Sequence, residues 1–375
     1  SIVSGSWCDM ATITLAANAD WSTCNGGSPP GATDEIRLAT FCLTLDALTC
    51  TCDTIKAVAA DGTTPTAGTL DFDICTELNA DVYAGTANLF TFTTETVVIN
   101  GRVTGRTAGA GSYGMYVNGA TADVTITEVY GGSSGYCYGV RLGNGILRVT
   151  TASATTSTAY GVNQIGGNLY LTNAVGGNGS GALWACTITG TGSGTATITN
   201  ATGASGAAYG GGVAVSDPNI AVTVTNATGG SSSIAATGTA PGVHSDGASN
   251  ITITNATGGD ARRGVGYYSS SSLSNCTIGV VKGGSLGPGV MWIDAGTISI
   301  VSIDNTGVGP AFGGNGNIKI ADGNLLSFQD ADGNAKTFYG DSEMPAAGDV
   351  RHGTVYGLTD FSGTMPSKRR IGALR

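Results

Sequence analysis

The sequence has few charged residues and only two histidines, which limits the chemistry that the chain can perform. Lys, Arg, Asp and Glu make up 11% of its 375 residues, against about a quarter in an ordinary globular domain. Acidic residues outnumber basic ones by 26 to 16, and the net charge of −10 argues against a nucleic-acid-binding surface. With only His244 and His352, neither a Ser-His-Asp arrangement nor a metal-ligand spacing has support, and we expect no metal and no cofactor.

Long apolar runs and helical patterns are also missing. No stretch of eighteen apolar residues exists, so we expect no membrane span. Residues 1–7 lack the positively charged region and the following apolar region of a signal peptide, so no export signal is expected in this sequence. The 62 glycines would interrupt most helical windows, and β-branched residues dominate the apolar positions, which favours strands.

One phrase recurs through the middle of the chain. Residues 196–202 read ATITNAT, residues 222–228 read VTVTNAT and residues 251–257 read ITITNAT, and glycine follows each copy. Looser copies lie on both sides. The central apolar residues of all copies are 22 to 29 positions apart: Ile126, Val149, Leu171, Ile198, Val224, Ile253, Ile278 and Ile300. A repeat of one short strand plus turns at this period is the signature of a solenoid.

A second periodic signal lies between the first ones. Glycine precedes an apolar residue at Gly114-Met115, Gly139-Val140, Gly161-Val162, Gly212-Val213, Gly242-Val243, Gly264-Val265 and Gly289-Val290. Each coil therefore has at least two strands, with glycine- and serine-rich turns between them. The sequence predicts an all-β fold, a right-handed parallel β-helix solenoid of about nine coils over residues 96–320, with strands stacked at roughly 4.8 Å.

The asparagine of the recurring phrase predicts a ladder. Asn173, Asn200, Asn226 and Asn255 all stand two positions after the central apolar residue. In register, their side-chain amides would bond one to the next at a turn. Three of them also form Asn-Ala-Thr sequons, for which glycosylation is the weaker interpretation because a stacked asparagine is inaccessible.

The two ends leave the repeat. Residues 1–55 carry Gly5-Ser6-Trp7, and later Pro29-Pro30 with Asp34 and alternating residues after it. This pattern resembles the N-terminal cap of parallel β-helix proteins, which implies that Trp7 and Trp21 plug the first coil. We therefore divide the chain into an N-terminal cap (1–55), a parallel β-helix (56–320) and a C-terminal appendage (321–375) with a hairpin that turns at Asp332-Gly333.

Six of the nine cysteines fall within the first 75 residues. A local disulfide such as Cys8–Cys24 and free, buried thiols that act as small hydrophobic residues are both open on the sequence alone.

The last thirty residues contain a second resemblance. Residues 349–357 read DVRHGTVYG, which resembles a short motif of phage structural proteins and some bacterial surface proteins. A basic tail follows on this acidic protein, and we expect Lys368, Arg369, Arg370 and Arg375 to bind a neighbouring subunit or another virion protein.

Carboxylates are the remaining candidates for chemistry. Asp217 and Asp246 each lie seven positions before the central apolar residue of the next strand. Stacked on adjacent coils about 5 Å apart, they would match the separation that a retaining glycosidase needs. His244 and Arg262-Arg263 are near in sequence, and Tyr267-Tyr268 and Trp292 are candidate sugar-binding aromatics. The favoured interpretation of both aspartates is a turn that caps the following strand.

These observations favour a structural protein over an enzyme. We expect a non-catalytic virion protein of a phage (a fibre, spike or capsid-decorating protein), with other virion proteins and itself as partners, as a homotrimer, which the resemblance implies. Host surface glycan is a further candidate partner, and nucleic acid is not expected. The alternatives are a glycan depolymerase of the tailspike type that uses Asp217 and Asp246, and an extracellular or cell-surface adhesin or filament subunit of a bacterium.

Overall fold

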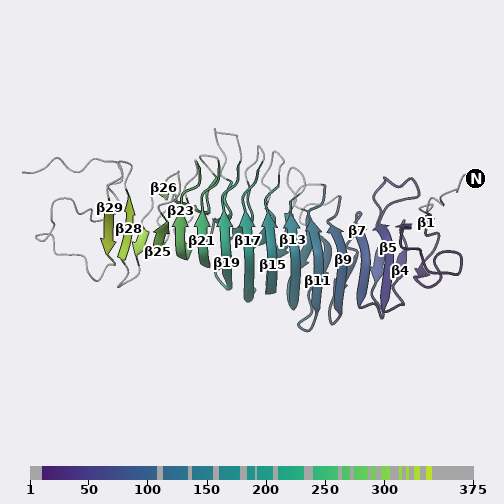
Figure 1. Ribbon diagram of the computed structural model, residues 1–375. Coiled ribbons are helices and arrows are strands. Elements are labelled where there is room, and N and C mark those ends of the chain that lie inside the picture. Colours follow the sequence, from purple (N-terminus) through teal and green to yellow (C-terminus); the bar gives the residue numbers. More distant parts are fainter. Residues whose placement is uncertain are drawn as a thin grey trace, which may run out of the picture.

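The computed structural model describes residues 11–107, 113–133, 137–154, 160–177, 184–190, 192–205, 210–231, 240–260, 264–270, 274–285, 289–292, 297–304, 312–314, 318–320, 325–329 and 335–339. These residues form strands and turns and contain no helix. The strands make a parallel β-solenoid of about ten turns, and the predicted fold class is confirmed. Figure 1 shows the strands as a row stacked along the axis of a rod.

A fourteen-stranded parallel sheet, called here the long sheet, runs the whole length of the rod. Its strands, in spatial order, are β1 (Thr12–Thr14), β3 (Glu35–Arg37), β5 (Thr49–Lys56), β7 (Glu77–Tyr83), β9 (Thr96–Thr104), β11 (Asp123–Tyr130), β13 (Ile146–Ser153), β15 (Gly167–Val175), β17 (Gly194–Thr202), β19 (Ile220–Thr228), β21 (Ser249–Thr257), β23 (Ser274–Lys282), β25 (Thr297–Asp304) and β27 (Ile318–Ile320). At about 4.8 Å between strands, this sheet is roughly 60 Å long.

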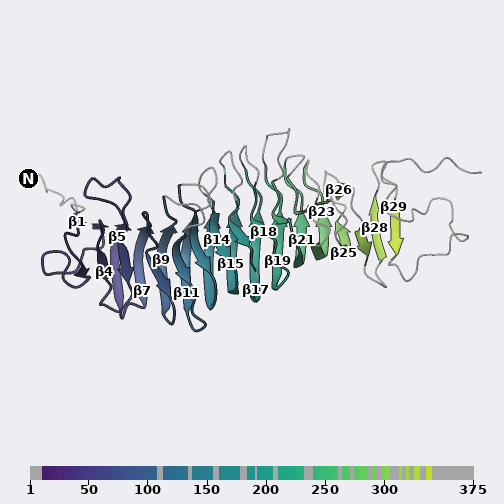
Figure 2. The ribbon, with the colours of Figure 1, turned by 180° about the vertical axis from the view of Figure 1, so that it is seen from behind.

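A ten-stranded parallel sheet, the second sheet, lies across the core from it (Figure 2). It comprises β8 (Phe90–Phe92), β10 (Tyr113–Val117), β12 (Tyr138–Leu142), β14 (Tyr160–Gln164), β16 (Cys186–Ile188), β18 (Val213–Val215), β20 (Val243–Ser245), β22 (Tyr267–Ser269), β24 (Val290–Trp292) and β26 (Phe312–Gly314). A three-stranded sheet of β2 (Ala19–Asp20), β4 (Cys42–Thr44) and β6 (Thr69–Asp71) takes this place in the first coils.

The register of the long sheet follows the recurring phrase. Ile198 pairs with Leu171 on one side and with Val224 on the other. The whole predicted series from Ile126 to Ile300 is paired residue by residue in this way. Nearly all of these side chains are fully buried, because they point into a core that each coil shares with its neighbours.

The second periodic signal is confirmed with one correction. Met115, Val140, Val162, Val213, Val243 and Val290 occupy equivalent inward positions of the second sheet, and Cys186 fills the coil that the pattern missed. The prediction of Gly264-Val265 is wrong. Gly266-Tyr267 takes that place, because Tyr267 pairs with Val243 and Val290 and is fully buried.

The glycine after each copy of the phrase leaves room for the neighbouring coil. A Cβ atom on Gly203 would lie 2.1 Å from the carbonyl oxygen of Ala240, and one on Gly230 would lie 1.9 Å from that of Ala204. The backbones of successive coils therefore approach too closely here for any side chain. Close approach of coils, and not a left-handed backbone, accounts for these repeated glycines.

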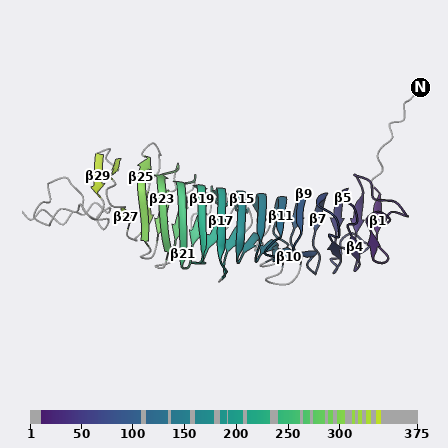
Figure 3. The same ribbon diagram turned by 90° about the horizontal axis from the view of Figure 1, so that it is seen from below.

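The strands near the two ends of the rod can be compared with the proposed boundaries at residues 55 and 320. β27 ends at Ile320, the predicted C-terminal limit, and β28 (Leu325–Gln329) pairs antiparallel with β29 (Ala335–Tyr339) as the expected hairpin (Figure 3). At the other end, β1, β3 and β5 already belong to the long sheet, and β5 crosses the proposed boundary at residue 55. Much of the predicted cap is therefore solenoid.

The described cysteines of the cap and the rod are free thiols. Cys50, Cys52, Cys75, Cys137, Cys186 and Cys276 are buried, and Cys24 and Cys42 are half-buried. Trp21 is 3% exposed and packs in the core of the first coils. Trp7 and Cys8 lie outside the described residues.

Candidate functional site

The long strands bend at the asparagine of the recurring phrase. In β17, Ala196, Ile198 and Ala201 are buried, so the inward spacing changes from two to three residues across Thr199 and Asn200. The strand pairing skips Thr199 at the same point. This bend divides each long strand into two faces and places the asparagines in a column at the corner of the rod.

The four asparagines form a hydrogen-bonded ladder. Asn200 Nδ2 donates to Asn173 Oδ1 at 3.0 Å, Asn226 donates to Asn200 at 2.9 Å, and Asn255 donates to Asn226 at 2.9 Å. All four residues are half-buried. Each sequon amide is thus engaged in the ladder, which leaves these asparagines a structural role.

The same corner carries charges in the coils nearer the N-terminus. Thr151 stacks under Asn173, and Glu128 stacks under Thr151. Arg102 pairs with Glu128 at 3.2 Å, and its backbone NH donates to Asp81 Oδ1 at 2.9 Å. At this corner, an ion pair therefore takes the place in the N-terminal coils that the asparagine ladder takes in the coils toward the C-terminus.

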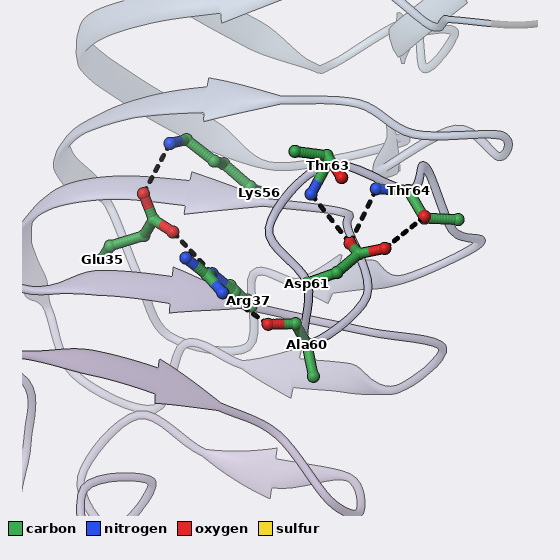
Figure 4. Close-up of polar contacts among 7 residues, drawn as sticks. All are labelled: Glu35, Arg37, Lys56, Ala60, Asp61, Thr63 and Thr64. Atoms are coloured by element: carbon green, nitrogen blue, oxygen red, sulfur yellow. Dashed lines mark hydrogen bonds and ion pairs between the residues drawn. The ribbon is translucent and has the colours of Figure 1, made fainter.

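A second ion-pair cluster lies at the start of the rod (Figure 4). Glu35 contacts Arg37 at 2.7 Å and Lys56 at 2.5 Å, and Arg37 also donates to the carbonyl of Ala60 at 2.5 Å. Burial pushes the pKa of Glu35 upward, but the hydrogen bonds from Lys56 and Arg37 outweigh it and leave that pKa lowered. Because both cations are committed to one carboxylate, this cluster fastens the first coils and leaves no group for acid–base work.

Beside this cluster, Asp61 closes a turn (Figure 4). It accepts hydrogen bonds from the backbone NH groups of Thr63 and Thr64 and from the Thr64 hydroxyl, and these bonds lower its pKa to about 2. This aspartate is a turn former.

The two aspartates proposed for glycan cleavage do not form an exposed pair. Val215 pairs with Ser245, so Asp217 lies two residues past that pair and Asp246 only one. Asp217 is fully buried and accepts a hydrogen bond from the NH of Asn219 at 2.8 Å, whereas Asp246 is exposed. The expected stacking of these carboxylates on one accessible face is therefore wrong, because a one-residue shift sends the two side chains in opposite directions.

Asp246 keeps one unusual property. Partial desolvation of its carboxyl by the neighbouring coils raises its pKa. The second carboxyl of the proposed pair, that of Asp217, is buried, and a retaining mechanism requires two carboxyl groups that face the same sugar.

His244 lies between two aromatic rings on the outer side of the second sheet. Its ring centroid is 5.3 Å from that of Trp184 and 4.8 Å from that of Tyr268, and its Nε2 lies 2.9 Å from the Ser270 hydroxyl. Burial lowers the pKa of His244 to about 4. The residue is therefore neutral near pH 7 and packs as an aromatic ring. Its contact with Trp184 was not predicted, because Trp184 belongs to neither of the two periodic patterns in the sequence.

Other proposed residues are scattered or lie outside the description. Tyr267 is in the core, 9% of the surface of Tyr268 is exposed, and Trp292 is the last residue of β24. Arg262-Arg263 and the basic tail (Lys368, Arg369, Arg370 and Arg375) lie outside the described residues. Binding by that tail stays a prediction.

The outer side of the second sheet also carries a group that sequence reasoning missed. Arg141 stands beside Tyr113 and Tyr116, with its guanidinium carbon 5.5 Å from each ring centroid. The register of β10 and β12 produces this contact, because Tyr116 pairs with Arg141 and Tyr113 pairs with Tyr138. The only signal in the sequence was the repeated Tyr-Gly pair at residues 113, 138 and 160.

In the part of the chain that the structure describes, no group of three or more His, Cys, Asp or Glu side chains could hold a metal ion. The same residues include no helix long and apolar enough to cross a bilayer. No protein-family model, no curated protein and no solved structure matches this chain.

Proposed function

We propose that this protein is a non-catalytic structural rod, a virion protein of a phage that serves as a fibre, a spike or a capsid decoration. The observation that carries the proposal is the continuous parallel pairing of the strands of the long sheet from β1 to β27. A shared core and a continuous backbone ladder make such a solenoid resist bending, which suits a part that holds a binding surface away from a particle.

The distribution of reactive groups supports a structural role. Asp217 is buried, His244 is neutral and enclosed by rings, and Glu35 is held by two cations. None of these three candidates is therefore an accessible acid or base of the kind that glycoside hydrolysis needs. The virion assignment itself rests on the likeness of residues 349–357 to phage sequences.

The test is the location of the chain in particles. Phage particles from a culture that carries the gene are purified on a density gradient, and their proteins are identified by mass spectrometry. We expect the intact chain to co-purify with the particles. Recovery of the chain from the cell envelope and not from particles would contradict the proposal and favour the adhesin.

The basic tail provides a second test of assembly. A chain that lacks residues 366–375 should fold as the full chain does but should no longer incorporate into particles, and we propose that the assembled form is a homotrimer. Sedimentation of the purified full chain checks the trimer, and unchanged incorporation of the truncated chain would remove the tail from the proposal.

A further inference from the structure

Arg141 differs from the other described arginines in having neither a carboxylate partner nor any other hydrogen-bond acceptor. Arg37, Arg102 and Arg148 form ion pairs with Glu35, Glu128 and Asp123. Arg106 donates to Asn88 Oδ1 at 3.4 Å and to the carbonyl of Thr86. Within the described ranges, Arg141 has neither an ion pair nor a hydrogen bond, and its Nε is buried without a partner.

A half-buried guanidinium without an acceptor is unusual in this protein. The chain carries an excess of acidic residues, so carboxylates are available to neutralise every arginine. Leaving a partly desolvated charge unpaired costs free energy. The cation–π contacts with Tyr113 and Tyr116 offset part of this cost, and a bound anion would offset more of it.

The surroundings of Arg141 define the shape of that ligand. The rings of Tyr113 and Tyr116 lie 5.0 Å apart at an angle of 49° and flank the guanidinium. A Cβ atom on Gly143 would lie 2.5 Å from the Tyr116 hydroxyl and 2.6 Å from Asn118 Oδ1, so the absence of a side chain at Gly143 brings a hydroxyl and an amide together. We call these five residues the Arg141 site.

The chemistry of the Arg141 site matches a carboxylated sugar. A guanidinium presents parallel N–H donors that fit a carboxylate. Tyrosine rings offer apolar faces to the C–H faces of a sugar ring, and the Tyr116 hydroxyl and the Asn118 amide can exchange hydrogen bonds with its hydroxyl groups. We propose that the Arg141 site binds an acidic saccharide, with the sugar carboxylate on Arg141.

The position of the site on the rod agrees with this ligand. Its residues belong to β10 and β12 and the turns after them, and they stand on the outer side of the second sheet, because Met115, Val117, Val140 and Leu142 between them point into the core. Next to it, the half-buried Tyr138 stacks on the buried Tyr160 with 5.2 Å between ring centroids, which fixes the edge of the site.

This inference rests on the proposed function in one respect: a rigid rod keeps the neighbouring coils that form the Arg141 site in a fixed register. It adds a ligand class to the rod, and the two are tested separately. Failure to find the chain in virions would leave saccharide binding untouched, and failure to bind saccharide would leave the structural role untouched.

The test is titration calorimetry on the purified full chain with matched probes. Tetragalacturonate and sialyllactose carry carboxylates, and methyl-esterified tetragalacturonate and lactose are their neutral counterparts. We expect at least one acidic probe to bind, its neutral counterpart to bind at least tenfold more weakly, and Arg141→Gln to lose at least tenfold in affinity for the acidic probe.

Arg148→Gln is the matched control. Arg148 also lies over a tyrosine ring, that of Tyr170 at 4.9 Å, but it is on the long sheet and is paired with Asp123 at 3.1 Å. This variant should bind the acidic probe as the unaltered chain does, and thermal melts of both variants check that the rod is folded. Absence of binding by both acidic probes, equal binding of the neutral probes, or an unchanged affinity of folded Arg141→Gln would each overturn the proposal.

Discussion

The coils around β9 and β11 and the coils around β17 and β19 belong to one sheet but stabilise its corner by different means. In the first group, Arg102 and Glu128 make an ion pair with both side chains 38% exposed. In the second, neutral asparagines bond to one another with the same donor direction in every coil. Strands β15, β17, β19 and β21 contain no charged residue at all.

The difference shows what each device demands of the sequence. An ion pair needs only two complementary residues in adjacent coils, so the other positions of those coils are free to vary. An amide ladder needs the same residue in every coil, because each asparagine is the donor to one neighbour and the acceptor for the next. The recurring phrase is strictest where the ladder runs, and it loosens where charges replace it.

Acid should affect the coils of the asparagine ladder most. The unfolded chain protonates His244 near pH 6.5, whereas burial holds the pKa of the folded residue at about 4. Stability contributed by the neutral ring is complete above pH 6.5 and is lost as the pH falls toward 4, by up to about 3 kcal/mol. Denaturant unfolding between pH 7 and pH 4 measures this loss.

His244→Phe is the matched variant for this prediction. It keeps an aromatic ring between Trp184 and Tyr268 but cannot be protonated. Its free energy of unfolding should change less over the same pH range. An acid dependence equal to that of the unaltered chain would assign the effect to other groups.

Interruption of the ladder should have the next largest effect. Asn226→Leu removes the donor to Asn200 and the acceptor for Asn255, and we expect a loss of about 2 kcal/mol in the free energy of unfolding. Asn250→Leu is the control, because Asn250 is an exposed asparagine of the neighbouring strand. Equal losses in the two variants would show that the ladder contributes little.

The ion pair at the corner should contribute least. Glu128→Gln removes the partner of Arg102, and we expect a loss of about 0.5 kcal/mol at low salt, because half-exposed pairs are weak. The loss should vanish at 1 M salt, where charges are screened within about 3 Å. The loss in Asn226→Leu should be unchanged by salt, and a salt-dependent ladder would contradict the distinction between the two groups of coils.

Because the sequence is repetitive, much of the fold could be predicted from it. The spacing of residues such as Ile198 and Val224 predicted both the strands and their register, because a solenoid stacks equivalent residues directly. The turns were not accessible in this way. Asp217 and Asp246 are equally distant in sequence from the next strand, yet a one-residue difference in the turn buries one of them and exposes the other.

The candidate ligand site was hidden for a related reason. The sequence does not indicate that Arg141 lies one coil away from Tyr113 and Tyr116 or contacts their rings. It also does not indicate that Arg141 has no carboxylate partner among the described residues. Whether a side chain contacts its counterpart in the next coil depends on the register of the two strands and on how the chain turns at the ends of those strands. Such contacts appear only when the coils are placed together.

The sequence by itself determined the parallel solenoid, the inward residues of the long sheet and the asparagine ladder, because each depends only on residues that recur in phase. The tertiary structure decided which polar groups are buried, which carboxylates meet, and which arginine is left unpaired. These outcomes depend on the turns between strands, where the phase of the repeat changes by one residue and a side chain moves from the core to the surface.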